Sequence, residues 1–114
     1  MRLTDEATVT EQGCAERLAR FFPSASRVHV PVQITALRAG SSLLREATVV
    51  EFGGLEHAIF LSCLPLEFDD RVRIERDRNG GTAEATVIAV QYHEGRKAVA
   101  VRFRPGPCAW VTQP

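Results

Sequence analysis

Long apolar segments are missing from this sequence. Among its longest apolar runs is Ala58-Ile59-Phe60-Leu61, far short of the ~20 residues that a membrane-spanning helix requires. At the N-terminus, acidic Asp5-Glu6 comes almost at once, and no apolar stretch leads to a small-residue cleavage site as it would in a secretory signal. We therefore expect a cytoplasmic protein without membrane insertion.

An excess of one charge is also missing, because fourteen basic residues balance fourteen acidic ones and the formal net charge is zero. Proteins that hold nucleic acid chiefly by neutralising phosphates carry a basic excess, so nucleic acid is not the expected partner. Thirteen of the fourteen basic residues are arginine, however, and its planar fork suits phosphates, guanine edges and carboxylates. A local anion or nucleotide site therefore stays open.

Cysteine and histidine are scarce and widely spaced. The cysteines are Cys14, Cys63 and Cys108, and the histidines are His29, His57 and His93. The cysteines form no Cys-x-x-Cys pair, so we interpret them as packing residues in a reduced compartment. The histidines have no metal-ligand spacing, and the sequence has no Gly-rich phosphate loop and no nucleophile elbow. We expect no metal, no cofactor and no enzymatic activity.

With 114 residues the chain has room for one domain, and its first segment has a helical pattern. Thr8 precedes Glu11 by three residues, as in a capping box. Apolar residues then follow at helical spacing, namely Cys14, Leu18, Phe21 and Phe22. Pro23 disfavours helical geometry at the residue before it. The sequence predicts a helix over 8–22, within an N-terminal extension and hinge over 1–24.

From residue 27 onward the apolar period changes from helical to two, which is typical of half-buried strands. The pattern predicts six short strands, near 27–35, 47–51, 58–63, 71–75, 82–92 and 99–104, separated by glycine-containing turns or short loops. Their inward-facing residues are expected to be Val28, Val30, Val32, Ile34, Val72, Ile74, Val99, Val101 and Phe103. Pro31 cannot donate to a ladder, so it should lie at an edge or at a bulge. The fold class that follows is all-β, a closed or nearly closed antiparallel barrel over 25–104.

The remaining segment, 105–114, is expected to be a C-terminal tail. Pro105-Gly106-Pro107 stops the last strand. Trp110 is expected to pack across an open end of the barrel.

Four features of the stretch from Arg27 to Trp110 carry a family resemblance. They are Arg27-Val28 at the start of a strand ending Val-x-Ile, the run 47–51 before a glycine turn, the segment from Leu64 to Ile74 with its Asp-Arg-Val-Arg-Ile, and Val99-Ala100-Val101-Arg102-Phe103. In this order they resemble the PilZ family. The resemblance implies a six-stranded antiparallel barrel and a role in bacterial signalling, since many members bind cyclic di-GMP to control motility, polysaccharide export or a partner protein.

The ligand pattern of the PilZ family begins with Arg-x-x-x-Arg before the first strand. If Arg27 is the second arginine, the first position falls on Pro23, which has neither charge nor donor. Arg20 lies upstream and would substitute only if the hinge folds back. The arginine clamp that the resemblance implies is therefore broken.

The second family motif, Asp/Asn-x-Ser-x-x-Gly, aligns with the segment 51–56. Glu51 takes the acidic position, Gly53 replaces the serine and Glu56 replaces the glycine. Gly53 lacks the serine hydroxyl, Pro23 lacks the arginine fork, and Glu56 places a like charge near a dianionic ligand. Together these changes should remove about 3 to 6 kcal/mol of binding free energy. This is roughly a hundred- to ten-thousandfold in affinity.

The leading hypothesis is therefore a non-enzymatic PilZ-like signalling or adaptor module that contacts an unidentified protein, with cyclic di-GMP binding weak or lost. The candidate ligand-binding residues are Arg20, Arg27, Glu51, Gly53 and Glu56. One alternative is a cyclic di-GMP receptor that uses N-terminal arginines, including Arg17. Another is a small phosphate- or RNA-binding barrel that uses the outward arginines Arg71, Arg73, Arg76, Arg78, Arg102 and Arg104. Interleaved acids favour a solvated face over this last alternative.

Overall fold

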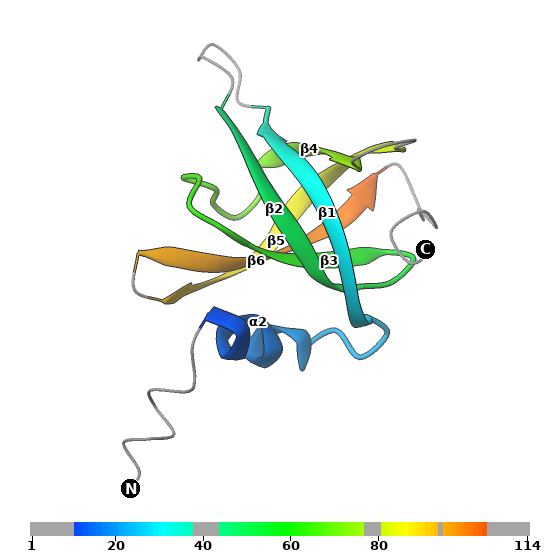
Figure 1. The fold of residues 1–114 in the computed structure, drawn as a ribbon, viewed down its shortest axis with the longest axis vertical. Helices are drawn as coiled ribbons and strands as arrows, with labels where there is room; N and C mark the ends of the chain where they lie inside the picture. Colours follow the sequence, from blue (N-terminus) through cyan, green and yellow to red (C-terminus); the bar gives the residue numbers. More distant parts are fainter. Residues whose placement is uncertain (1–10, 38–43, 77–80, 94, 105–114) are drawn as a thin grey trace, which may run out of the picture.

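The computed structural model describes residues 11–37, 44–76, 81–93 and 95–104 (Figure 1). One helix, α2 (Glu11–Ala19), precedes six strands. The strands are β1 (Ser26–Ala36), β2 (Leu44–Gly53), β3 (His57–Ser62), β4 (Arg71–Arg76), β5 (Thr82–His93) and β6 (Arg96–Arg104). Every predicted strand is confirmed, with ends that differ by a few residues.

The six strands form a closed barrel in the order β1-β2-β3-β6-β5-β4, and every neighbouring pair is antiparallel. Two three-stranded meanders, β1-β2-β3 and β4-β5-β6, are joined at both edges, so the barrel has no free sheet edge. The predicted fold class is confirmed.

The barrel interior is filled by the alternating apolar residues that the sequence indicated. The buried set includes Val30, Val32, Ile34, Val72, Ile74, Val99, Val101 and Phe103, and Val28 packs against it half-buried. Val50, Phe60 and Val87 from the other strands complete the same cluster. The period-two alternation thus predicted the inward faces of β1, β4 and β6 correctly.

The β3–β4 connection crosses one end of the barrel, because β3 and β4 are not neighbours. Leu66 in this connection is buried in the interior cluster, and its carbonyl accepts a hydrogen bond of 2.8 Å from Lys97 Nζ. The backbone N–H of Asp69 donates to the Val87 carbonyl at 2.8 Å, with Asp69 at a φ of 77°. Leu66 therefore closes an end of the barrel, whereas Trp110, predicted for that role, lies outside the described residues.

Helix α2 is shorter at its C-terminal end than the predicted 8–22 helix. It ends at Ala19, and the next backbone N–H groups, of Arg20, Phe21 and Phe22, donate to carbonyls three residues earlier. This tightening precedes Pro23, which disfavours α geometry at Phe22. Thr8 of the predicted capping box lies outside the described residues.

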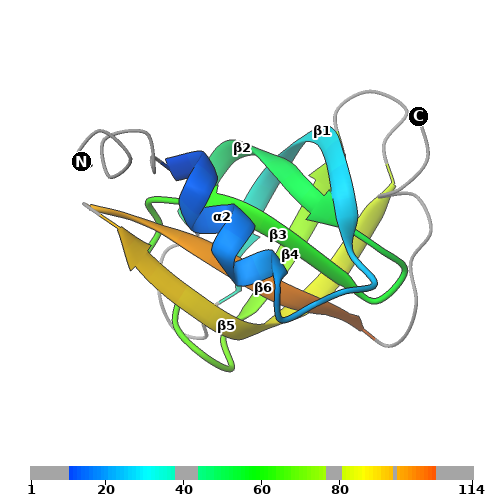
Figure 2. The ribbon, with the colours of Figure 1, turned by 90° about the horizontal axis from the view of Figure 1, so that it is seen from below.

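The helix packs against the outer surface of the barrel, over β3, β5 and β6 (Figure 2). Its Cys14, Ala15 and Leu18 are buried there. They meet an outer strip on the barrel, defined here as Phe52, Ile59, Leu61, Ala98 and Ala100, all buried. Ala100 alternates with the inward-facing Val99 and Val101, so it points outward and is buried under the helix. The N-terminal segment is thus part of the packed domain.

The structure confirms the predicted place of Pro31 and only part of the prediction for the cysteines. Pro31 lies in the part of β1 that pairs with β2 but not with β4, just after a register shift between Arg27 and Val30. This place suits a residue that has no N–H to donate to a ladder.

Cys14 is a packing residue, as predicted, and burial raises the pKa of its thiol. The packing prediction is wrong for Cys63, which is exposed just after β3 ends. Cys108 lies outside the described residues.

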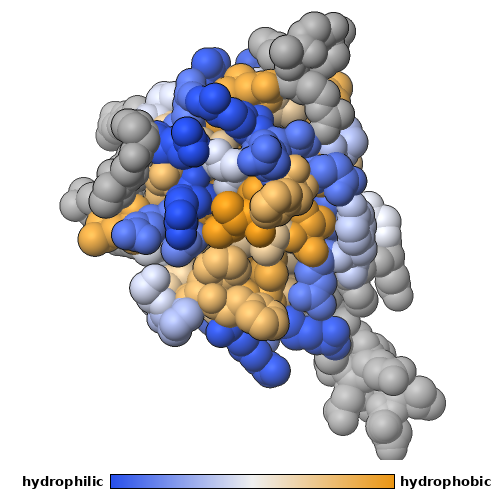
Figure 3. Space-filling model, turned by 180° about the vertical axis from the view of Figure 1, so that it is seen from behind, coloured by the Kyte–Doolittle hydropathy of each residue, from blue (hydrophilic) through white to orange (hydrophobic). Residues whose placement is uncertain are grey.

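The surface of the described chain mixes apolar and polar regions. Seen from behind, apolar side chains gather near the middle of the face, with hydrophilic ones around them (Figure 3). Phe21, Leu55, Phe68 and Tyr92 are each more than half exposed. No helix in this part of the chain has both the length and the apolar character to cross a bilayer.

Replacing Val101 by alanine should lower the free energy of unfolding by about 1 to 3 kcal/mol, because Val101 is fully buried among the interior side chains. Urea denaturation measures the change. The matched control is Val49→Ala on β2, where the side chain is half-buried opposite Pro31, and a smaller loss is expected. A Val101→Ala midpoint equal to that of the parent protein would contradict the observed register.

Candidate functional site

The residues of the degenerate motif lie where β1 begins and β2 ends. Arg27 pairs with Phe52, and Ser26 pairs with Gly53. Glu51 stands at a register shift of β2 between Val50 and Phe52. The backbone pairing therefore brings Arg27, Glu51 and Gly53 to one end of the barrel, as the sequence alignment required.

Glu56 and Arg20 flank this end from two other segments. Glu56 is exposed in the β2–β3 turn, which the Gly54 N–H closes by donating to the His57 carbonyl at 2.9 Å. Arg20 is exposed directly after α2, and it forms no ion pair with any residue that the structure describes. Arg27 instead contacts Glu16 and Phe52.

The Arg27 guanidinium is held by the chain itself. Its Nη2 lies 2.5 Å from Oε2 of Glu16 on α2, and the guanidinium stands 4.9 Å from the centre of the Phe52 ring. Both charged side chains remain about half exposed. The arginine fork that a dinucleotide phosphate would need is thus directed at a carboxylate and an aromatic face.

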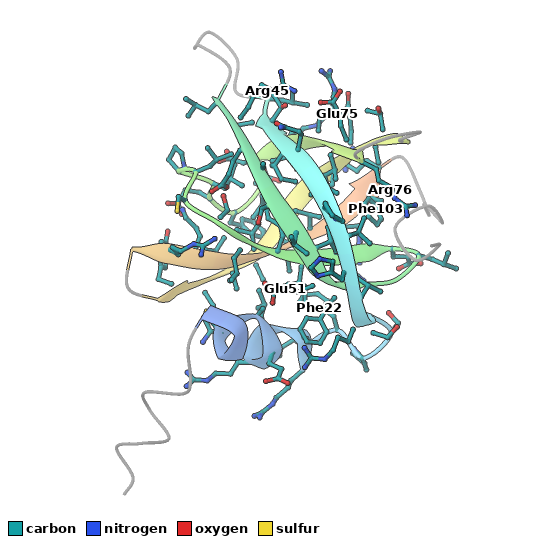
Figure 4. The ribbon with its side chains drawn as sticks, viewed as in Figure 1. Phe22, Arg45, Glu51, Glu75, Arg76 and Phe103 are labelled. Carbon is teal, nitrogen blue, oxygen red and sulfur yellow. The ribbon has the colours of Figure 1, made fainter. Side chains whose placement is uncertain are left out.

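The hinge between α2 and β1 covers the β2–β3 turn. Gly54 is buried, and a Cβ placed on it would come within 2.9 Å of the Ser24 carbonyl oxygen. Phe22 lies against His57, with ring centroids 4.9 Å apart and planes tilted by 48°. Glu51 and Phe22 both lie on the side of the barrel that faces α2, whereas Arg45 and Glu75 lie at the opposite end (Figure 4). The N-terminal segment thus fills the space beside the motif.

The glycine at position 54 was not singled out by the motif alignment, and neither were Glu16, Phe22 or Phe52. The Gly53-Gly54 pair was a signal, because close approach of two backbones needs a residue without a side chain. Glu16 gives no such signal, since nothing in its local pattern links it to Arg27 eleven positions away.

The outward arginines of β4 and β6 differ in their partners. Arg71 donates to Glu84 at 3.2 Å, and Arg73 stands 4.0 Å from the same carboxylate. Arg102 and Arg104 form no ion pair with the residues that the structure describes. The expected solvated face with cross-strand ion pairs is therefore confirmed for the β4 side only, and Arg78 lies outside the described residues.

Within the described ranges, no three His, Cys, Asp or Glu side chains come together as a possible metal site. The sequence matches no protein-family model and no curated protein.

Burial lowers the pKa of His57 below its ordinary value of 6.5, and the positive charge of Arg102 adds to this, while Glu56 opposes it. The fold thus favours neutral His57. As the pH falls below about 6.5, the unfolded chain takes up a proton that the folded chain does not, so stability decreases until the lowered pKa is passed.

Replacing His57 by phenylalanine should remove this contribution, because the ring against Phe22 is kept and the ionisable group is lost. Urea denaturation between about pH 7.5 and 5 should show a smaller loss of stability on acidification than in the parent protein. Identical slopes for His57→Phe and the parent would contradict the assignment.

Proposed function

We propose that this protein is a non-enzymatic module of PilZ-like architecture that acts through contacts with another protein, with cyclic di-GMP binding weak or lost. One observation carries the proposal: the chain's own N-terminal segment occupies the surface around the degenerate motif. There Arg27 is paired with Glu16, and Gly54 lies against Ser24. A ligand would have to displace both contacts.

The strand arrangement supports the PilZ-like part of the proposal. A PilZ resemblance implies six antiparallel strands in a barrel, and the strands of this chain have that number, orientation and closure. A barrel of this kind is compatible with many functions, so the choice among them depends on the site. The non-enzymatic part rests on the sequence, which offers no nucleophile with a nearby base.

The alternative of a cyclic di-GMP receptor built on N-terminal arginines fits the geometry less well. Arg17 and Arg20 are exposed, but the third arginine, Arg27, would have to leave Glu16 and Phe52 to reach a phosphate. Glu16 and Glu56 would then both lie beside a dianionic ligand. Like charges at this range oppose binding.

We expect cyclic di-GMP to bind with a dissociation constant weaker than about 100 μM, because three motif positions carry Pro23, Gly53 and Glu56 and Arg27 is already paired. Isothermal titration calorimetry measures it directly. A value below ~10 μM would sink the proposal and favour the receptor alternative.

The matched positive control restores the motif by Pro23→Arg, Gly53→Ser and Glu56→Gly, together with Glu16→Gln to release Arg27. These changes act on one ligand, so their effects should reinforce one another. The restored variant should gain measurable binding while keeping the circular dichroism spectrum of the parent. If it folds and still gives no heat, the alignment of Arg27 and Glu51 with the PilZ motif is wrong.

Exposed apolar side chains border the contact between the hinge and the β2–β3 turn. Phe21 is 75% exposed three residues before Ser24, and Leu55 is 55% exposed next to Gly54. Contiguous exposed apolar patches mark protein interfaces, and Phe21 and Leu55 flank the same contact between the hinge and the turn. We place the partner's contact surface here.

The double variant Phe21→Ser, Leu55→Ser removes two exposed apolar side chains without changing the core. In affinity capture followed by mass spectrometry, it should therefore lose a partner that the parent protein retains. Phe68→Ser is the control, since Phe68 is as exposed as Phe21 but belongs to the β3–β4 connection. Loss of the partner with Phe68→Ser alone would move the interface to that connection and contradict our placement.

A further inference from the structure

A polar row crosses three strands of the outer surface where α2 ends. Arg102 on β6 pairs with Thr86 on β5 and with His57 on β3, so Arg102 has a direct cross-strand neighbour on either side. Such neighbours have Cβ atoms about 4.5–5.5 Å apart and can share a ligand. On β4, Arg71 continues the row beyond Thr86.

Two polar atoms of this row are buried without a hydrogen-bond partner in the part of the chain that the structure describes. They are Nδ1 of His57 and Oγ1 of Thr86, one on either side of Arg102. A buried polar atom without a partner is costly, and a cluster of two is unusual in a folded protein. The half-buried Phe22 lies against the His57 ring, and the half-exposed Arg71 is the cross-strand neighbour of Thr86 on its other side.

The two arginines of β6 in and beside this row, Arg102 and Arg104, are not paired with a carboxylate among the described residues. Arg104 follows Arg102 along β6 on the same face, and its cross-strand neighbour on β5 is Glu84. The Glu84 carboxylate accepts its hydrogen bond from Arg71 on β4, not from Arg104. Among the described residues, Arg102 and Arg104 have no carboxylate within ion-pair distance. The row therefore combines two uncommitted guanidinium groups with a hydroxyl and an imidazole.

We propose that Arg102, Arg104, Thr86 and His57 form a binding site for a single phosphate group, carried by inorganic phosphate or by a small phosphomonoester. Arginine forks and a hydroxyl suit the several oxygens of a tetrahedral oxyanion, whereas a carboxylate would leave donors unused. The bound oxygens would supply the hydrogen bonds that Thr86 Oγ1 and His57 Nδ1 lack. The site lies on the outer surface of β3, β5 and β6, next to the β2–β3 turn.

The surroundings favour one phosphate over a polyanion. Glu84 on β5 and Glu56 in the β2–β3 turn both flank the row, and α2 covers the outer strip on its other side. A nucleic-acid backbone would have to pass one of these carboxylates or the apolar helix. The balanced net charge of the chain also provides no wider attraction for polyanions.

The test is a titration of the 15N-labelled protein with inorganic phosphate and, separately, with O-phosphoserine, at constant ionic strength. The amide signals of His57, Thr86 and Arg102 should shift and saturate. Tighter binding of phosphoserine would assign the site to a phosphomonoester, and equal or weaker binding would assign it to free phosphate. Arg102→Gln should weaken binding about tenfold or more, and Thr86→Val about threefold to tenfold.

The control is Arg45→Gln, which removes the same charge from β2 at the opposite end of the barrel, where Arg45 pairs with Glu75. It should change the affinity by less than about twofold, because distant surface charges are screened. Absence of saturable shifts up to ~50 mM phosphate would overturn the proposal. So would an equal loss in Arg45→Gln and Arg102→Gln, or a preference for an RNA oligonucleotide that both variants weaken alike. Thr86→Val preserves shape and charge, so it keeps the test valid if Arg102→Gln folds poorly.

Discussion

The docking of α2 on the outer strip is the packing interaction on which the rest of the surface depends. A closed barrel buries the inward face of its strands, but Ile59, Leu61 and Ala100 point the other way and need a cover. The helix is only nine residues long, too short to be stable alone in water. Burial of Leu18, worth about 1.5–3 kcal/mol, and of its neighbours therefore holds the helix and covers the strip at once.

The state of the motif region follows from this docking. Once α2 is seated, Glu16 stands beside Arg27, and the turn before Pro23 carries the hinge back over Gly54. An exposed ion pair contributes at most about 1 kcal/mol, so Glu16 orients the guanidinium more than it stabilises the fold. The occupation of the site is thus a consequence of apolar packing elsewhere.

The interior of the barrel could be predicted from the sequence, while the exterior could not. Alternation along β1 and β4 is a local pattern, and it identified Val32, Ile34 and Ile74 because one face of each strand is wet. The run Ala58-Ile59-Phe60-Leu61 is apolar without alternation, which is typical of a strand buried on both faces. Periodicity cannot say which element covers the second face. Periodicity also cannot predict the ion pair between Arg27 and Glu16, which depends on where α2 packs on the barrel.

His57 connects the two surfaces discussed above. Its ring lies against Phe22 of the hinge, while its strand position makes it a neighbour of Arg102. Burial favours the neutral imidazole, and the nearby guanidinium acts in the same direction. A partner that draws the hinge away would expose His57, and an anion beside Arg102 would favour its protonated form. If a partner binds at the hinge and an anion binds beside Arg102, the two binding events would therefore be coupled through His57.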